Sequence, residues 1–270
     1  MVLKNLMVHL DGGTRTAARL DMAVALARRH QARLVGVFGQ RAEAMHIGVV
    51  PRWPPAAYTQ AASDSETAFR IAAQGLAQAE WIDVNRGRDV ELFSQITAAA
   101  RFVDLVVLGQ YDGDQAGRLP PELPEEVVLN SGRPALVVPY VGDYRVPFER
   151  PLIAWNNSRE AAHALNDALP LIEGCREAVV LSLDVRTDQA EASCAAVVRQ
   201  LASHGINATT EVLTVEDVGI MDMLLNRVTD QGADLLVMGA HGQLGFPFVS
   251  RGAGTRHILR NMTVPVLMSN

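Results

Sequence analysis

The feature that most constrains this chain is an internal repeat, in which one order of short apolar runs and helical stretches occurs twice along 270 residues. Three pairs of segments match in the same order: residues 5–13 with 151–158, 103–109 with 233–239, and 133–138 with 264–269. A period this long predicts two duplicated domains and not a solenoid, whose repeats run to ~20–50 residues.

Within each half, short apolar runs alternate with longer stretches of helical periodicity, which is typical of a parallel sheet with crossover helices. The expected strands are residues 6–10, 32–38, 81–86, 105–108 and 135–138, then 152–155, 178–183, 208–213, 235–238 and 265–268. The expected helices are residues 14–29, 63–79, 89–100 and 123–130, then 158–172, 189–204, 219–231 and 254–261. The predicted fold class is therefore α/β.

Local signals suggest where these elements begin and where the domains divide. Residues 142–150 are polar and contain Pro147, so we expect domains at 1–142 and 150–270. Thr14 and Ser63, the latter with Glu66 three residues later, are expected to cap helices. The stretch Met45–Tyr58, rich in proline and aromatic residues, is expected to be an irregular loop over a sheet edge.

Composition argues against several classes of partner and site. The net charge of −6 disfavours nucleic acid or an anionic membrane as the main partner. We find neither a signal peptide nor a run of the ~18–20 apolar residues that a membrane span needs, so we expect a cytoplasmic protein. Cys175 and Cys194 lack close ligand spacing, so neither a disulfide framework nor a metal site is expected.

Three glycines follow the last long apolar run: Gly239, Gly242 and Gly252, separated by two and then nine residues. Glycine lets the backbone approach an anion, and the start of the following helix offers free N–H groups to phosphate. Glycines also serve turns and caps, so the spacing leaves both interpretations open. Asn156 and Gly239 each follow a predicted strand, so they can line one crevice at the carboxyl edge of the sheet.

Together with the segments at 129–139 and 153–161 and the tail RHILRNMTVPVLMS, this loop resembles the universal stress protein (UspA-like) family. The resemblance spans essentially the whole chain, as in a tandem two-domain member. It implies two Rossmann-like domains of the adenine nucleotide alpha hydrolase-like type, each with a five-stranded parallel sheet flanked by helices. It also implies that the domains pair through their last strands, here residues 135–138 and 265–268.

Some members of the family bind ATP, and others lack the motif and bind none. In the binders, an Asp at the end of the first strand holds the adenosine part, and the glycine loop with a Ser or Thr holds ribose and phosphates. Carried over, the cofactor-binding candidates for ATP, with Mg²⁺, are Asn156, Asn157, Ser158, Gly239, His241, Gly242, Gly252, Ala253, Gly254 and Thr255.

This chain departs from the pattern at two of these positions. Asn156 replaces the Asp, which keeps hydrogen-bonding capacity but removes the charge. Ala253 stands where the hydroxyl residue belongs, and Thr255 substitutes for it only if the helix start is shifted. His241 is equally consistent with a ligand contact and with a solvent-facing loop residue.

The first half departs further from the pattern. Asp11 fits the strand-end position, but Gly109 is followed by Asp112 and Asp114, which would repel a triphosphate. We therefore expect the first half to be a copy that binds no nucleotide.

The resemblance implies a stress-response regulatory protein, non-enzymatic or at most a slow ATPase, with an adenine nucleotide in its second domain. No catalytic residue is assigned, because Ser158 is expected to cap a helix and no carboxylate is placed to orient His241. The alternative is a structural or interaction protein whose glycine loop is a relic. A nucleotide-using transferase would need catalytic bases that we do not find, and homodimerisation stays open.

Overall fold

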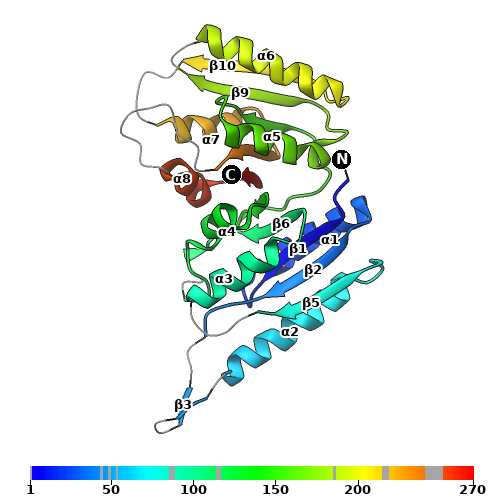
Figure 1. The fold of residues 1–270 in the computed structure, drawn as a ribbon, viewed down its shortest axis with the longest axis vertical. Helices are drawn as coiled ribbons and strands as arrows, with labels where there is room; N and C mark the ends of the chain where they lie inside the picture. Colours follow the sequence, from blue (N-terminus) through cyan, green and yellow to red (C-terminus); the bar gives the residue numbers. More distant parts are fainter. Residues whose placement is uncertain are drawn as a thin grey trace. The chain divides into compact units, whose positions relative to one another are not determined.

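The computed structural model describes residues 2–42, 45–47, 50–52, 54–84, 89–113, 117–184, 187–214, 219–240 and 252–270. They form two compact units, residues 2–133 and 134–270, which we call the N-terminal and C-terminal units. Each unit contains a largely parallel sheet with helices on its faces (Figure 1), so the predicted α/β class is confirmed.

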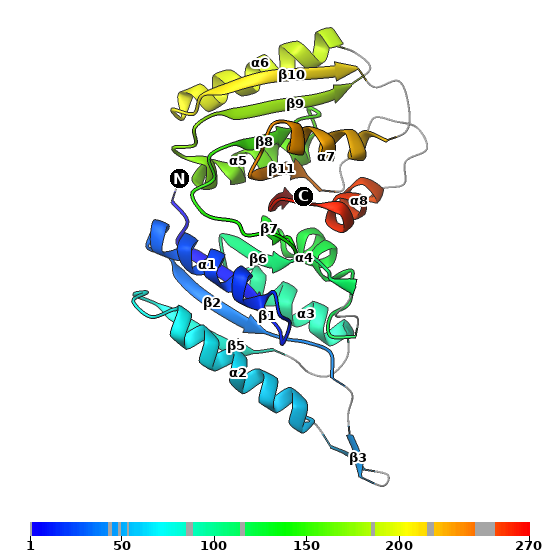
Figure 2. The ribbon, with the colours of Figure 1, turned by 180° about the vertical axis from the view of Figure 1, so that it is seen from behind.

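The N-terminal unit contains a parallel sheet of strand order β5-β2-β1-β6. Its strands are β1 (Asn5–Leu10), β2 (Arg33–Phe38), β5 (Ala79–Asp83) and β6 (Leu105–Gly109), with a separate hairpin of β3 (Met45–Ile47) and β4 (Val50–Arg52). Its helices are α1 (Thr16–His30), α2 (Ala56–Ala72), α3 (Asp89–Ala100) and α4 (Leu123–Ser131). Helices α1 and α2 cover one face and α3 and α4 the other (Figures 1 and 2).

The C-terminal unit has the strand order β10-β9-β8-β11-β12-β7. Its strands are β7 (Ala135–Val138), β8 (Pro151–Ala154), β9 (Ala178–Asp184), β10 (Ala208–Thr214), β11 (Leu235–Gly239) and β12 (Val266–Ser269). Its helices are α5 (Arg159–Ile172), α6 (Thr187–Ser203), α7 (Ile220–Asp230) and α8 (Ala253–Asn261). The five strands from β8 to β12 are parallel, as expected, and β7 joins β12 antiparallel.

The division between the units follows from that antiparallel pair. Leu136 lies opposite Leu267, so the last strand of the first repeat completes the sheet of the second. The compact units therefore part between Arg133 and Pro134, ahead of the linker at 142–150. The expected pairing of the two last strands is present.

The central strands are buried on both faces, which explains why they read as continuous apolar runs and do not alternate. The side chains of Leu6, Met7 and Val8 in β1 and of Leu235, Leu236 and Val237 in β11 are fully buried. These runs were therefore the most predictable elements of the chain.

Three local predictions were wrong. The stretch Met45–Tyr58 contains the β3–β4 hairpin and the first residues of α2. The helix begins this early because Pro55 takes the extended N-cap position. Ser63 consequently lies inside α2 and caps nothing. Thr14 does not cap α1 either, since its N-cap is Arg15, without a side-chain hydrogen bond.

Candidate functional site

The strand order of the C-terminal unit reverses between β8 and β11. The chain runs from β8 outward through β9 to β10, then returns to β11 on the other side of β8. In open α/β sheets, ligands bind beyond the carboxyl ends of the strands at such a reversal. Residues 155–158, after β8, and Gly239, at the end of β11, occupy this place, as the sequence predicted.

A small hydrogen-bonded turn follows β8. Asn156 Oδ1 accepts from the backbone N of Ser158 at 3.2 Å and from its hydroxyl at 2.7 Å. Ser158 Oγ in turn accepts from Ala161 N at 3.1 Å, so Ser158 is the N-cap of α5. Asn157 takes the left-handed conformation, with a φ of 54°, which asparagine tolerates better than most residues.

This turn leaves two amide groups available to a ligand. Asn156 and Asn157 are both exposed. Within the described part of the chain, the side-chain nitrogen of neither residue donates a hydrogen bond. Because Asn156 Oδ1 is engaged by Ser158, what Asn156 offers to a ligand at the strand ends is a donor.

Gly239 has a structural reason of its own to be glycine. A Cβ added there would lie 2.6 Å from the backbone N of Ala161 and 2.6 Å from the carbonyl carbon of Glu160. The end of β11 therefore packs directly on the first turn of α5, and any side chain would collide with backbone. Glycine is required here with or without a ligand.

Glu160 brings a charge close to Gly239. Its side chain is largely buried, and it accepts from Arg159 at 3.1 Å. A hydrogen bond from its own backbone N–H, and then Arg159, lower the pKa of Glu160 despite its partial burial. This carboxylate, which the sequence did not single out, therefore remains ionised at neutral pH.

Helix α8 supplies the other described part of the expected loop. Gly252, with a φ of 84°, is its N-cap and provides no side-chain cap. Ala253 is the first helical residue, so no hydroxyl stands at that position. Gly254 is buried, and Thr255 is only 3% exposed, within the first turn. His241 and Gly242 lie outside the described residues, so their role stays a prediction.

Residues 160–270 match the model of the Universal stress protein family. Residues 160–270 are a universal stress protein domain. The match includes α5, the end of β11 and α8, and it begins after the turn at residues 155–158.

Solved structures extend the likeness of fold to the whole chain. A universal stress protein from Archaeoglobus fulgidus DSM 4304 aligns with 98% of this chain and 96% of its own, at 15% identity and a TM-score of 0.69. A functionally unknown protein from Pseudomonas aeruginosa PAO1 aligns with 99% of this chain and 92% of its own, at 13% identity and a TM-score of 0.63. At these identities the likeness shows the fold alone.

Two further comparisons add no argument about the ligand. A universal stress protein in complex with cAMP aligns with 52% of this chain, at 20% identity and a TM-score of 0.37, which is too low to bear on the ligand of this chain. A search of curated proteins found no match.

The N-terminal unit has the same strand reversal, between β1 and β6, but its strand-end carboxylate is engaged by the unit itself. Asp11, after β1, forms a buried ion pair with Arg19 of α1, with Oδ2 and Nη2 2.7 Å apart and side chains 6% and 5% exposed. The other carboxylate oxygen accepts from Thr16 Oγ1 at 2.8 Å and from Gly13 N. Arg19 Nε donates to the carbonyl of His9 at 2.7 Å.

Arg19 also lies across the end of β6. A Cβ added at Gly109 would lie 2.0 Å from Arg19 Nη1, so the guanidinium occupies the space beside that glycine. The sequence analysis missed Arg19, although one signal was present: it is a lone arginine among the apolar residues of the buried face of α1. The predicted loop carboxylate Asp114 lies outside the described residues.

Burial and charge together set the protonation of this cluster. Burial alone would raise the pKa of Asp11, but Arg19 and the hydrogen bond from Thr16 outweigh it, and that pKa falls far below its usual range. Burial, with Arg19, lowers the pKa of His9 to about 4. His9 is therefore neutral at pH 7, and its Nε2 lies 2.9 Å from the carbonyl oxygen of Gly39.

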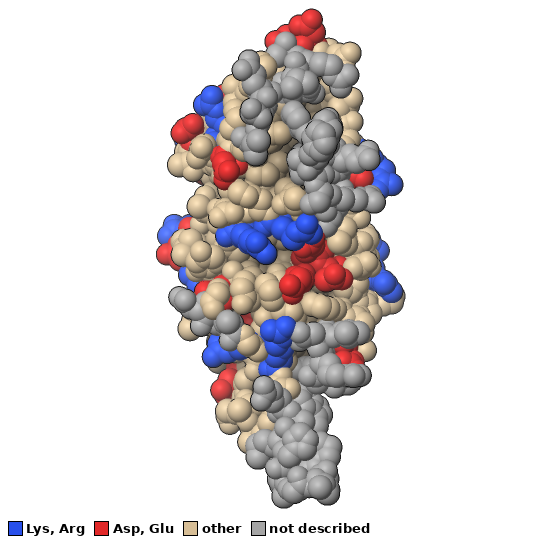
Figure 3. All heavy atoms as spheres, turned by 90° about the vertical axis from the view of Figure 1, so that its left-hand side faces the viewer, with Lys and Arg blue, Asp and Glu red and all other residues tan. Residues whose placement is uncertain are grey.

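Among the described residues, no group of three or more His, Cys, Asp or Glu is placed to hold a metal ion. In the same ranges, no helix combines the length and apolar character that a bilayer crossing requires. On the face in Figure 3, basic and acidic side chains form small neighbouring groups and no extended field of one sign.

Proposed function

We propose that the C-terminal universal stress protein domain binds an adenine nucleotide, ATP with Mg²⁺ as the candidate, beyond the carboxyl ends of β8 and β11. One observation carries the proposal: two exposed asparagine amides with uncommitted donors stand at the strand reversal. Binding sites are distinguished by a few convergent polar groups of this kind. On this proposal the chain is a cytoplasmic stress-response regulator that binds without turnover.

The described groups divide between the two ends of such a ligand. Asn156 Nδ2 would donate to acceptor atoms of the adenosine part, which the aspartate of other family members cannot do. The first N–H groups of α8, behind Gly252, would face the phosphates. Because Ala253 adds no hydroxyl, the phosphates would be held by backbone donors, including those of the loop with His241 and Gly242.

One observation favours the alternative of a protein that binds no nucleotide. Gly239 is explained completely by its contact with the backbone of α5, so this glycine of the motif would persist after the loss of a ligand. On that alternative the chain acts through protein partners, and further dimerisation is one form such a contact would take.

Nucleotide content and binding separate the two proposals. The freshly purified chain is denatured and its supernatant analysed for nucleotides, and Mg-ATP is then titrated into nucleotide-free protein by calorimetry. We expect about one site per chain and a roughly fivefold loss of affinity in Asn156→Ala, since one uncharged hydrogen bond contributes on the order of 1 kcal/mol. Asn207→Ala, an exposed asparagine of the same unit, is the matched control.

Two results would contradict nucleotide binding in this crevice. One is an empty protein that shows no saturable heat with Mg-ATP. The other is equal affinity in the wild type and Asn156→Ala, which would move the site elsewhere on the chain.

A further inference from the structure

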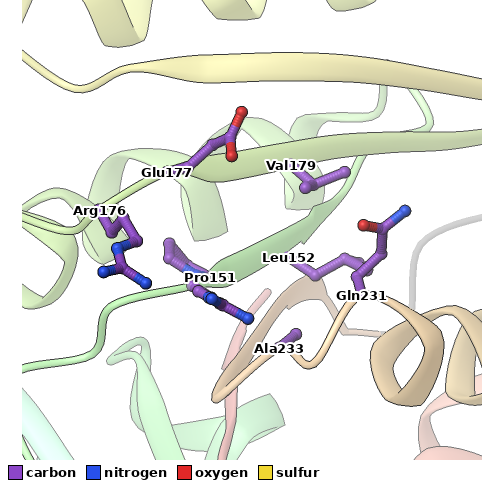
Figure 4. Close-up of a pocket in the computed structure, with 8 residues that line it drawn as sticks. Pro151, Leu152, Arg176, Glu177, Val179, Gln231 and Ala233 are labelled. Atoms are coloured by element: carbon purple, nitrogen blue, oxygen red, sulfur yellow. The ribbon is translucent and has the colours of Figure 1, made fainter.

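A cavity of about 240 Å³ lies in the C-terminal unit at the amino ends of β8, β9 and β11 (Figure 4). It is lined by the first residues of β8, by residues at the start of β9, and by Ala233, just before β11. Because these strands are parallel, the cavity is at the opposite edge of the sheet from the proposed nucleotide crevice.

Half of the eight residues that line the cavity are apolar, and its volume is small. Pro151, Leu152, Val179 and Ala233 supply carbon surface. Pockets for drug-sized ligands typically have volumes of about 300–1,000 Å³. A volume below that range suits a compact molecule with a short apolar body.

Two arginines that line the cavity make no ion pair with any of the residues that the structure describes. Arg150 and Arg176 both line the cavity and are exposed. Within the described ranges, neither guanidinium makes a hydrogen bond or an ion pair. Figure 4 shows Arg176 at one end of the cavity, Gln231 at the other, and the Glu177 carboxylate turned away from Arg176.

The backbone holds these two arginines in place. Arg176 N donates to the carbonyl of Glu149 at 2.8 Å, one residue before Arg150. Arg150 N donates to Asp234 Oδ1 at 2.9 Å, and Asp234 N donates to the Arg150 carbonyl at 3.2 Å. The backbones of the two arginines are therefore held close together, with the Asp234 carboxylate engaged by backbone N–H groups and neither guanidinium paired with a carboxylate within the described ranges. A bound anion would stabilise such an arrangement.

We propose that this cavity binds a small organic carboxylate, its anionic end at Arg150 and Arg176 and its short apolar body against the apolar lining residues. These residues favour an organic acid over inorganic phosphate, which has no carbon surface to bury. Arginine suits this role because its planar group matches the two oxygens of a carboxylate. The proposal is independent of nucleotide binding, since the two sites share no residue.

Benzoate is the probe for this site, titrated into the full-length chain in a low-chloride buffer and followed by the NMR signals of the arginine Nε–H groups. We expect saturable shifts and an affinity that falls about tenfold or more in Arg150→Ala and in Arg176→Ala, as expected for loss of a charge-assisted hydrogen bond. Arg199→Ala, an exposed arginine on α6, is the matched control and should bind as the wild type does.

Glu177→Gln tests the sign of the charge effect, because removing a carboxylate from the lining should strengthen benzoate binding several-fold. The proposal is overturned if benzoate shows no saturable binding, if Arg199→Ala weakens it as much as the cavity variants do, or if inorganic phosphate competes equally well. Because the side chains of Arg150, Arg176 and Glu177 are exposed and the bonds of Asp234 to residues 149 and 150 go to backbone N–H groups, the variants are expected to fold.

Discussion

At the strand reversal of the N-terminal unit stands Asp11, and at that of the C-terminal unit stands Asn156. Asp11 is buried and paired with Arg19, whose guanidinium fills the space beside Gly109. Asn156 is exposed, and its amide nitrogen has no partner among the described residues. A carboxylate there binds a cation from its own helix, whereas an amide engages only the next turn. One position is thus used for stability in one unit and left available in the other.

The largest expected effect comes from breaking the closed site. Asp11→Ala leaves the buried guanidinium of Arg19 without its counter-charge, and we expect the N-terminal unit to lose about 3–5 kcal/mol of stability. Hydrogen exchange read peptide by peptide measures this unit, with the C-terminal unit as internal reference. Asn156→Ala is the matched variant and should change the stability of its unit by less than about 1 kcal/mol. Equal losses in the two variants would mean that the two turns are used alike.

The second effect is a pH dependence confined to the N-terminal unit. The pKa of His9 falls from its ordinary value of 6.5 to about 4 on folding, so between these values the unfolded state binds a proton that the folded state does not. Stability should therefore fall as the pH drops from 6.5 to 4, by about 3 kcal/mol in all. The depressed pKa of Asp11 adds a further loss only below about pH 4.

The pH effect is checked by hydrogen exchange of both units at pH 6.5 and 4.5, corrected for intrinsic exchange rates. His9→Gln should remove most of the dependence between these values. A dependence of the same size in the C-terminal unit would argue against a buried neutral histidine as the cause.

A third effect tests the packing of the open site. Gly239→Ala places a Cβ against the backbone of α5, so we expect a loss of about 2 kcal/mol in the C-terminal unit. Gly113→Ala is the control, because nothing lies within 4 Å of an added Cβ there. Thermal unfolding of both variants measures the difference. If the Gly239→Ala variant is as stable as the wild type, packing on α5 does not require glycine at this position, and only a ligand-binding role would explain it.

The smallest expected effect is a gain in nucleotide affinity at the open site of the C-terminal unit. Ala253→Ser restores a hydroxyl at the start of α8 and should strengthen Mg-ATP binding by up to about tenfold without a change in stability. Calorimetry on this variant and the wild type decides the point. An unchanged affinity would show that the phosphates do not reach the start of α8.

The fold was predictable because the central strands are buried on both faces and therefore read as continuous apolar runs. The irregular loop predicted at Met45–Tyr58 was wrong because proline does not exclude regular structure: it is well tolerated at a helix start, where Pro55 stands. The helix cap predicted at Ser63 was also wrong, because the Ser63–Glu66 spacing can occur inside a helix as well as at its start.

For the site, the strand-end positions were predictable, but the commitments of their atoms were not. The sequence does not show that Asn156 Oδ1 accepts hydrogen bonds from Ser158 while Asn156 Nδ2 makes none, because this depends on the backbone path of the turn. Arg19 was missed because it is eight residues from Asp11 in sequence, and only the helix brings its guanidinium back to the end of β1.

The antiparallel pair of β7 and β12 has a consequence for association. Two separate single-domain chains that joined through such strands would come apart on dilution, whereas here β7 is delivered to β12 by the same polypeptide. Because the two strands are tethered, their pairing depends on a fixed effective concentration and not on the protein concentration. That effective concentration is on the order of millimolar for a short flexible connection. The two copies therefore always occur one to one, and a fragment starting at residue 150 would lack β7 and leave the edge of β12 open to a second chain.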